Sequence, residues 1–317
     1  MTLFEKHDLK HLLTIAIIAL MSFGSKAQYI WDFGAKLGAA NYLGDIGGGE
    51  GPAQDFVYDL KIEATRISGG AYGRYFMGNS VAASIHLTQA MISGADENST
   101  NPERYSRNLS FRNGLVELTP RLEWHIIKIH DVGRTFRYRL NFNFFLYGGA
   151  GVVWSNPKAK LNDQWVALQP LQTEGVKYGR FQFTAPVGIG AFFRHNKRHV
   201  IGAEFGWRWT MTDYLDDIRG FYQNPDNFED PIARTLADRS VEMDPNDPLF
   251  IGSNFYGEGS KANPAVPAKR GNPENNDSYF VAGFTYGYAL RGKTSFSRSR
   301  YNFIKGKPRK RRSKAKF

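Results

Sequence analysis

Residues 116–126 read VELTPRLEWHI, and every second side chain in this stretch is apolar. In an extended chain, one face carries Val116, Leu118, Pro120, Leu122, Trp124 and Ile126. The other face carries Glu117, Thr119, Arg121, Glu123 and His125. In a soluble sandwich the apolar face would meet a core, whereas in a transmembrane barrel it would meet lipid and the charged face would line the lumen.

Seven further segments repeat this alternation over roughly 9–13 residues, which suits a tilted membrane strand better than a soluble one. They are residues 31–39, 67–76, 81–91, 138–152, 181–193, 199–211 and 280–290. Short connections (77–80, 127–137, 194–198) alternate with long ones (43–66, 92–113, 153–180, 212–278). The pattern predicts an all-β transmembrane antiparallel barrel of eight strands, with long extracellular loops and short periplasmic turns.

The N-terminus has the pattern of a secretory signal peptide. Lys6 and Lys10 precede the apolar stretch 12–21, and Ser25-Lys26-Ala27 follows it. We therefore expect residues 1–27 to be removed and the barrel to span 28–291; an uncleaved N-terminal anchor is the alternative. The chain has no cysteine, which excludes a lipoprotein, a disulfide and a thiolate metal ligand.

The positive charge is concentrated at the C-terminus. The formal net charge is +11, and residues 291–317 contain twelve Lys or Arg and no acid, so the remainder is close to neutral (11 − 12 = −1). Such a segment is predicted to be a disordered tail. Both this tail and the N-terminus of the mature chain are predicted to lie in the periplasm. The residues predicted to dock on a periplasmic partner are Arg298, Arg300, Tyr301, Phe303, Arg309, Lys310, Arg311 and Arg312. A solvated tail without a partner is the alternative, and nucleic acid is not expected behind an export signal.

Charged side chains on the inward faces of the strands are nearly balanced in sign. The predicted interior network is Lys36, Arg74, Glu117, Arg121, Glu123, Arg139, Glu204 and Arg208. An eight-stranded barrel is just wide enough for side chains to fill it. We therefore expect a packed salt-bridge core, with a conducting pore or a catalytic carboxylate pair as the alternatives.

Aromatic residues fall near both ends of the predicted strands, as in the girdles of membrane barrels. The predicted periplasmic girdle is Trp31, Trp124, Tyr138, Phe193 and Tyr288, and the predicted outer girdle is Trp154, Trp207, Trp209 and Phe280. The alternative is that they are core aromatics of a soluble β domain. Pro120 and Pro186 interrupt strand patterns, and we expect a local bulge at each.

No pattern in the chain predicts catalysis, a cofactor or a metal site. The glycine-rich stretches 47–49 and 148–151 lack the Lys-Ser/Thr and the helix of a phosphate-binding loop. Six acidic residues between 213 and 230 lack the spacing of a calcium loop, so a solvated acidic loop is expected: Asp213, Asp216, Asp217, Asp226, Glu229 and Asp230. The protein is not expected to be an enzyme.

Three segments resemble the PorG-type outer-membrane proteins of Bacteroidota. They are GAKLGAANYLGDIGG (34–48), RYSRNLSFRNGLVELTPRLEWHI (104–126) and YGGAGVVWSNPKAKL (147–161). The resemblance runs from about residue 28 to 214, whereas the 212–278 loop and the basic tail are less typical. It implies a non-enzymatic barrel of the type IX secretion and gliding machinery, which anchors the periplasmic PorK/PorN ring to the outer membrane. A small transport barrel and an adhesin-like surface-binding barrel are the alternatives.

Overall fold

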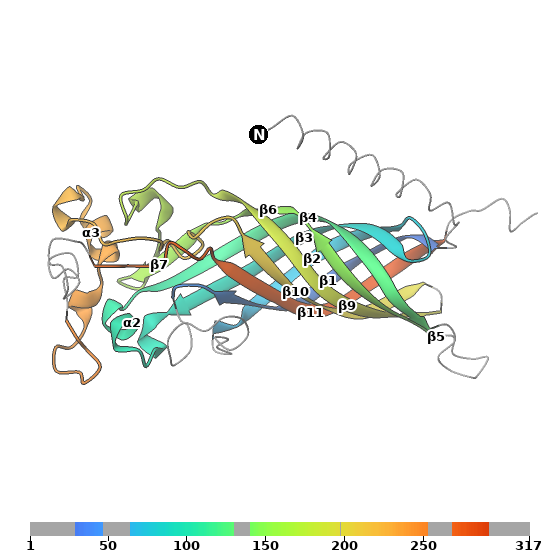
Figure 1. Ribbon diagram of the computed structural model, residues 1–317, viewed down its shortest axis with the longest axis horizontal. Coiled ribbons are helices and arrows are strands. Elements are labelled where there is room, and N and C mark those ends of the chain that lie inside the picture. The colour runs from blue at the N-terminus through green and yellow to red at the C-terminus, as the bar shows by residue number, and fades with distance from the viewer. Residues whose placement is uncertain (1–28, 47–63, 130–139, 197, 253–267, 292–317) are drawn as a thin grey trace, which may run out of the picture.

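The computed structural model describes residues 29–46, 64–129, 140–196, 198–252 and 268–291, and long antiparallel strands dominate it (Figure 1). The strands that form the wall are β1 (Tyr29–Leu43), β2 (Arg66–Phe76), β3 (Val81–Ala95), β4 (Ser110–Ile129), β5 (Leu140–Gly149), β6 (Gly151–Trp154), β9 (Phe181–His195), β10 (His199–Thr210) and β11 (Ser278–Arg291). The predicted signal peptide and the predicted basic tail lie outside the described residues, as do Tyr138 and Arg139.

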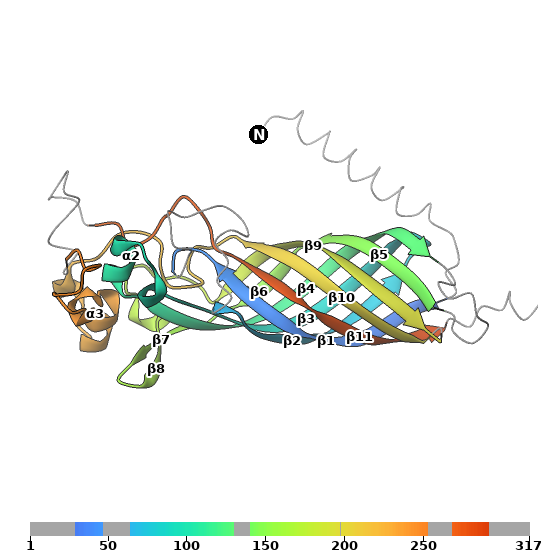
Figure 2. The same cartoon turned by 90° about the horizontal axis from the view of Figure 1, so that it is seen from below.

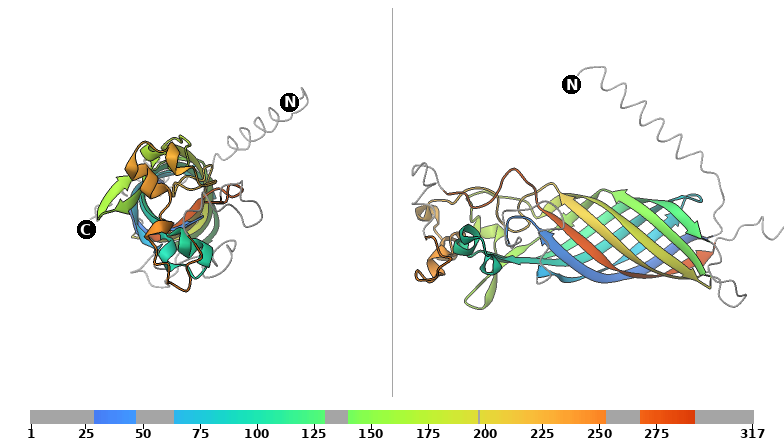
Figure 3. Two further views of the ribbon diagram at one scale, coloured as in Figure 1. Left: turned by 90° about the vertical axis from the view of Figure 1, so that its left-hand side faces the viewer. Right: turned by 60° about the horizontal axis from the view of Figure 1, so that its bottom comes forward.

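These strands close into a ring. The hydrogen-bonded order is β3-β2-β1-β11-β10-β9-β5-β4, and β3 pairs with β4 to complete it. Because β6 follows β5 between β4 and β9, the described ring passes through eight strand positions. Figure 3 shows the ring end-on. The predicted antiparallel barrel is confirmed, although its strands are longer than expected, with 20 residues in β4.

The alternation of apolar and polar residues in 116–126 separates the two faces of β4. Trp124 is 58 % exposed and Leu122 is 54 % exposed, whereas Glu117, Arg121 and Glu123 are each at most 3 % exposed. The same division holds in β3, where Ile85 and Leu87 point outward and Ser84, His86 and Thr88 point inward. The barrel is therefore apolar outside and polar inside, the reverse of a soluble barrel.

The prediction of bulges at Pro120 and Pro186 is wrong. β4 keeps one register across Pro120, from Arg121 opposite Gly149 to Leu118 opposite Val152. β9 likewise keeps its register across Pro186, from Val187 opposite Gly148 to Thr184 opposite Gly151. Both prolines therefore flank the gap at Ala150 between β5 and β6, where the ladder skips bonds instead of shifting. The one register shift in the β4–β5 pair lies between His125 and Ile127.

The two ends of the barrel differ, as predicted. At the turn end, β2 and β3 are joined by residues 77–80, and β9 and β10 by residues 196–198. The long connections meet at the opposite end and form a folded cap (Figure 2). The cap contains η3 (Asp96–Asn98), α2 (Pro102–Arg107), β7 (Pro157–Leu161), β8 (Gln164–Ala167), η4 (Gln169–Leu171), η5 (Pro225–Asn227), α3 (Pro231–Ala237) and η6 (Ser240–Glu242). In the described residues, no helix has the length and apolar character needed to span a bilayer.

Glycines on the lumenal face make room for two aromatic rings. A Cβ at Gly190 would lie 2.3 Å from the Phe145 ring, and one at Gly206 would collide with the Tyr147 hydroxyl. Gly114, on the outer face, has no atom within 4 Å of the corresponding position. Gly190 and Gly206 therefore allow the Phe145 and Tyr147 rings to pack closely against the backbone, whereas no described side chain packs against Gly114.

We expect Gly190→Ala to destabilise the barrel by about 1–3 kcal/mol, because the added methyl group must displace Phe145. Gly114→Ala is the matched control and should change the free energy of unfolding little. Urea unfolding of the refolded protein in detergent micelles measures both. Equal stability of the two variants would contradict this close packing.

Candidate functional site

Arg74, on β2, lies at the centre of the lumenal charges. Its guanidinium is 2.5 Å from Glu123 Oε2, 3.5 Å from Glu204 Oε1 and 3.8 Å from Asp32 Oδ2. It also lies 5.0 Å from the ring centroids of both Phe145 and Phe192. One side chain thus holds three acidic residues from three other strands, and apolar rings shield the group from water.

A second layer of ion pairs lies nearer the cap. Arg121 Nη1 is 3.2 Å from Glu204 Oε2, so Glu204 joins the two layers. Arg208 Nε is 3.1 Å from Glu117 Oε2, and Thr119 donates a hydrogen bond to the other oxygen of Glu117 at 2.7 Å. Every lumenal carboxylate in this layer therefore has a cation beside it.

The structure places the predicted interior residues as follows. One connected set of ion pairs contains Arg74, Arg121, Glu123 and Glu204. The adjoining ion pair is formed by Glu117 and Arg208. Lys36 is half-buried and lines a small cavity of about 10 Å³ with Glu204 and Arg208. Arg139 lies outside the described residues.

Sequence reasoning missed several members of this set. Arg194 Nη2 donates to both oxygens of Asp32, at 2.8 and 3.1 Å. Ser84 donates to Glu123 at 2.6 Å, and both His86 and His125 lie within 4 Å of the same carboxylate. The sequence contained a signal for them, because every one occupies an alternate strand position that points into the lumen. The five residues are Asp32, Ser84, His86, His125 and Arg194.

Ser84, His86 and Glu123 resemble a nucleophilic triad in composition but not in arrangement. The Ser84 hydroxyl donates to Glu123 directly, and His86 Nε2 lies 3.1 Å from Ser84 Oγ. All three side chains are at most 6 % exposed, inside a packed lumen. The three side chains are therefore part of the packed lumen, away from any surface that a substrate could reach.

Apolar side chains pack between the ion pairs and close the lumen at the cap end. One buried cluster is interleaved with the charges, since the Tyr147 ring centroid lies 4.4 Å from Arg121 and the Phe145 and Phe192 ring centroids lie 5.0 Å from Arg74. Its members are Phe76, Ala82, Phe145, Tyr147, Phe192, Val200 and Ala289. Towards the cap, a second cluster includes Tyr42, Ile92, Phe111, Leu115, Leu215 and Ile218. Since Leu215 and Ile218 come from the connection after β10, the cap itself completes the upper closure.

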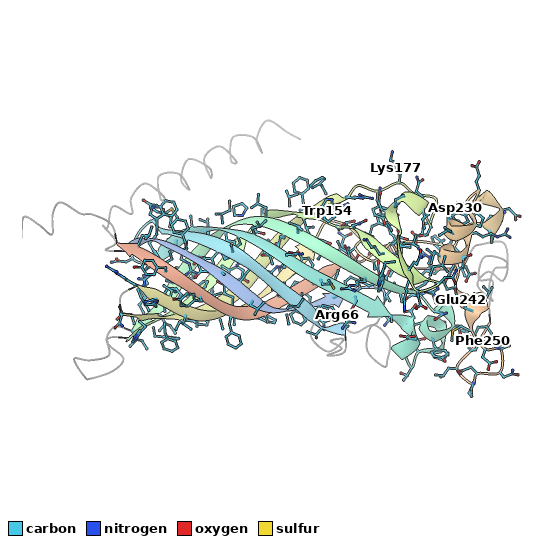
Figure 4. All side chains as sticks on the ribbon, turned by 180° about the vertical axis from the view of Figure 1, so that it is seen from behind. Arg66, Trp154, Lys177, Asp230, Glu242 and Phe250 are labelled. Carbon is cyan, nitrogen blue, oxygen red and sulfur yellow. The ribbon has the colours of Figure 1, made fainter. Side chains whose placement is uncertain are left out.

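The predicted girdle residues fall into two groups at opposite ends. Trp31 pairs with Tyr75, Trp124 with Val81 and Tyr288 with His199, all near the turn end. Trp154 pairs with Phe181 and Trp209 with Ser278, near the cap. Trp31, Trp124, Tyr288, Phe193 and Trp209 are 39–58 % exposed, Trp154 and Trp207 are half-buried, and Phe280 is buried. In Figure 4, Arg66 and Trp154 mark the junction of barrel and cap, whereas Asp230, Glu242 and Phe250 lie on the cap.

Two buried arginines tie the cap to the barrel. Arg107 donates to both carboxylate oxygens of Asp96, at 2.7 and 2.9 Å, and to the backbone oxygens of Asp45 and Arg270. Arg270 in turn contacts Glu174 at 3.1 Å and the backbone oxygen of Asp217 at 2.9 Å. Four connections that lie far apart in sequence therefore meet around two guanidinium groups.

The prediction of a solvated acidic loop is wrong for Asp213, Asp216 and Asp217, which are each at most 3 % exposed. Leu215 lies between these acids in the sequence and Ile218 follows them. Both pack into the apolar cluster at the cap end, and the acids are buried with them. Asp217 accepts hydrogen bonds from Thr173 and Tyr178, both at 2.5 Å. Burial nevertheless raises the pKa of Asp217 to about 6, against the opposing charge of Arg270. Asp226, Glu229 and Asp230 are exposed, as predicted.

Comparisons with known proteins give one matching family model and several similar solved structures. The family model DUF6089, described as a domain of unknown function, matches residues 10–230. The N-terminal β-barrel domain of Pseudomonas aeruginosa OprF is similar at 8% identity, with 83% of this chain and 98% of that one covered and a TM-score of 0.32. Yersinia pestis Ail, the attachment invasion locus protein, in complex with a heparin analogue, is similar at 11% identity. The match covers 82% of this chain and 99% of that one, with a TM-score of 0.33.

Pseudomonas aeruginosa OprG, an outer-membrane protein, gives 10% identity, coverage of 84% and 100%, and a TM-score of 0.28. No curated protein matches the chain significantly. At these identities and TM-scores, the similarity implies nothing about what this chain binds.

We expect Arg74→Met to cost roughly 3–5 kcal/mol of folding free energy, because it leaves Glu123, Glu204 and Asp32 without their shared cation. Arg234→Met is the matched control: Arg234 is 57 % exposed and lies 3.8 Å from Asp226. Urea unfolding in micelles compares the two variants. Adding Glu123→Gln to Arg74→Met should restore part of the loss; no recovery, or a loss equal to that of the control, would contradict the pairing.

Proposed function

The chain belongs to the DUF6089 family, and we propose that it is a sealed outer-membrane barrel that acts as a structural anchor, with no enzymatic activity. The observation that carries this proposal is the lumen: buried ion pairs interleaved with aromatic rings fill it, and an apolar cluster closes it at the cap end. A barrel whose interior is filled cannot work through its axis. Its function then belongs to its outer wall and its two ends.

The outer wall supports placement in a membrane. Large apolar side chains point away from the lumen on every side of the ring, including Leu37 at 63 %, Phe181 at 73 % and Phe284 at 78 % exposed. Such a continuous apolar exterior would promote aggregation in water and is stable in lipid. The export pattern of residues 1–27 makes the outer membrane of a Gram-negative bacterium the expected location.

The turn end supports attachment to a periplasmic partner. Tyr29 pairs with Arg291, so both ends of the described barrel lie there. The basic segment that follows has twelve cationic residues and no acid from residue 291 onward, which suits an acidic protein surface. From the resemblance to PorG-type proteins, the proposed partner is the PorK/PorN ring of the type IX secretion system.

A second candidate function, surface binding, is favoured by the folded cap. A crevice of about 440 Å³ lies between Pro170–Gly175 on one side and Gln223–Ala233 on the other. Its lining mixes apolar residues with Gln172, Gln223 and Asn227, which can donate and accept hydrogen bonds. Transport through the axis, the other alternative, is not supported by a filled lumen.

Deletion of residues 295–317 should leave the barrel folded but reduce the recovery of the ring proteins. The expected reason is loss of long-range attraction, which salt already weakens because the Debye length is about 8 Å at 0.15 M. The measurement is co-purification of PorK/PorN-type proteins from detergent-solubilised outer membranes, at low and at high salt. Heat modifiability on gels checks that the truncated barrel is folded.

A variant with its basic residues 298–312 changed to Gln separates charge from length in the same assay. It should behave like the deletion. Full recovery of the ring proteins by both variants would mean that docking lies in the turns or that the barrel has another partner.

A further inference from the structure

Three carboxylate oxygens are buried at the mouth of the barrel without a hydrogen-bond partner. They are both side-chain oxygens of Asp213 and Oδ2 of Asp216. The two residues are 3 % and 1 % exposed, on the connection that follows β10. Leaving buried carboxylates unpartnered is costly, so the fold here contains polar capacity that its own residues do not use.

Further acidic groups surround these oxygens. The charges of Asp216 and Asp45 act on Asp213, and those of Asp277 and Asp45 act on Asp216. Asp277 already accepts hydrogen bonds from Tyr42 at 2.5 Å and from the backbone of Leu215 at 2.8 Å. Its position beside the free oxygens is therefore fixed.

The nearby cations do not balance this charge. Arg107 is engaged with Asp96, and Arg270 with Glu174. Arg219 acts on Asp213 but is itself exposed and lies over the Tyr214 ring, 5.9 Å away. Arg104 and Lys269 also act on Asp45. Among the described residues, Asp45, Asp213, Asp216 and Asp277 form no salt bridge, so either a proton or a bound cation must compensate them.

We propose that Asp213 and Asp216 bind one divalent cation, with calcium as the ion of matching chemistry, at the junction of barrel and cap. Calcium takes six to eight oxygens in flexible geometry and accepts carboxylates, backbone carbonyls and water. Three unpartnered carboxylate oxygens supply part of such a shell. The described residues contain no preformed group of three acidic or histidine ligands, so the remaining ligands are backbone carbonyls and water.

Protons compete with the ion for the same oxygens. Burial, and then the charges of Asp216 and Asp45, raise the pKa of Asp213 to about 9. A proton is therefore the competitor of the ion at these oxygens, because a carboxylate must lose its proton to bind a cation.

A bound cation would hold the connection after β10 against the barrel mouth. The same connection carries Leu215 and Ile218 into the upper apolar closure. The ion would therefore support the seal at the cap end, where the chain leaves carboxylate oxygens without partners.

The test uses the full mature chain, refolded from urea into detergent so that no lipopolysaccharide is present, and stripped with EDTA. Isothermal calorimetry with calcium chloride at pH 6 and pH 8 measures binding, and hydrogen exchange of peptides covering residues 211–219 measures the local effect. We expect one site, and slower exchange with calcium than without it.

Asp213→Asn mimics the protonated side chain and should fold without the ion. It should lose calcium binding by at least tenfold and lose the effect of calcium on exchange. Glu229→Gln, at an exposed acid of the same connection, is the matched control and should bind as the parent does. Absence of a binding heat at both pH values, or equal binding by Asp213→Asn and the parent, would overturn the proposal.

Discussion

The barrel depends on the pairing of buried charges around Arg74. A guanidinium at the centre of a narrow barrel loses its water, and only carboxylates in direct contact offset that cost. Asp32, Glu123 and Glu204 are supplied by β1, β4 and β10, so a single cation connects four strands of the ring. Because the interior is filled in this way, the inner strand positions have little freedom to change one at a time.

The cap follows from the same constraint at a different place. Its long connections carry arginines and acids inward together, and Arg107 and Arg270 join segments that lie more than 150 residues apart in sequence (Arg107 to Arg270, a separation of 163). Where the cations run out, at Asp213 and Asp216, the chain leaves unpartnered oxygens. In the lumen each acidic side chain has a cation beside it, whereas at the cap end Asp213 and Asp216 have none among the described residues.

The period-two alternation predicted most of the barrel, because side-chain direction in a strand depends only on parity. It assigned Glu117, Arg121 and Glu123 to the inner face without any knowledge of their partners. Parity could not predict which inward residues meet, because ion pairs such as Arg194–Asp32 depend on the ring order and the stagger of the strands. The prolines misled for a related reason: the gap at Ala150 absorbs both missing donors, and only the pairing of β4 and β9 with the same strand reveals it.

The cap was beyond prediction from composition. Six acids in one connection look solvated, but three of them are buried because Leu215 and Ile218 between them pack into the barrel mouth. Conduction through the refolded full chain in planar lipid bilayers tests most directly whether the lumen is filled. The sealed barrel predicts no steady conductance above that of bilayers given detergent alone or heat-denatured protein. A steady, ion-selective channel would contradict it.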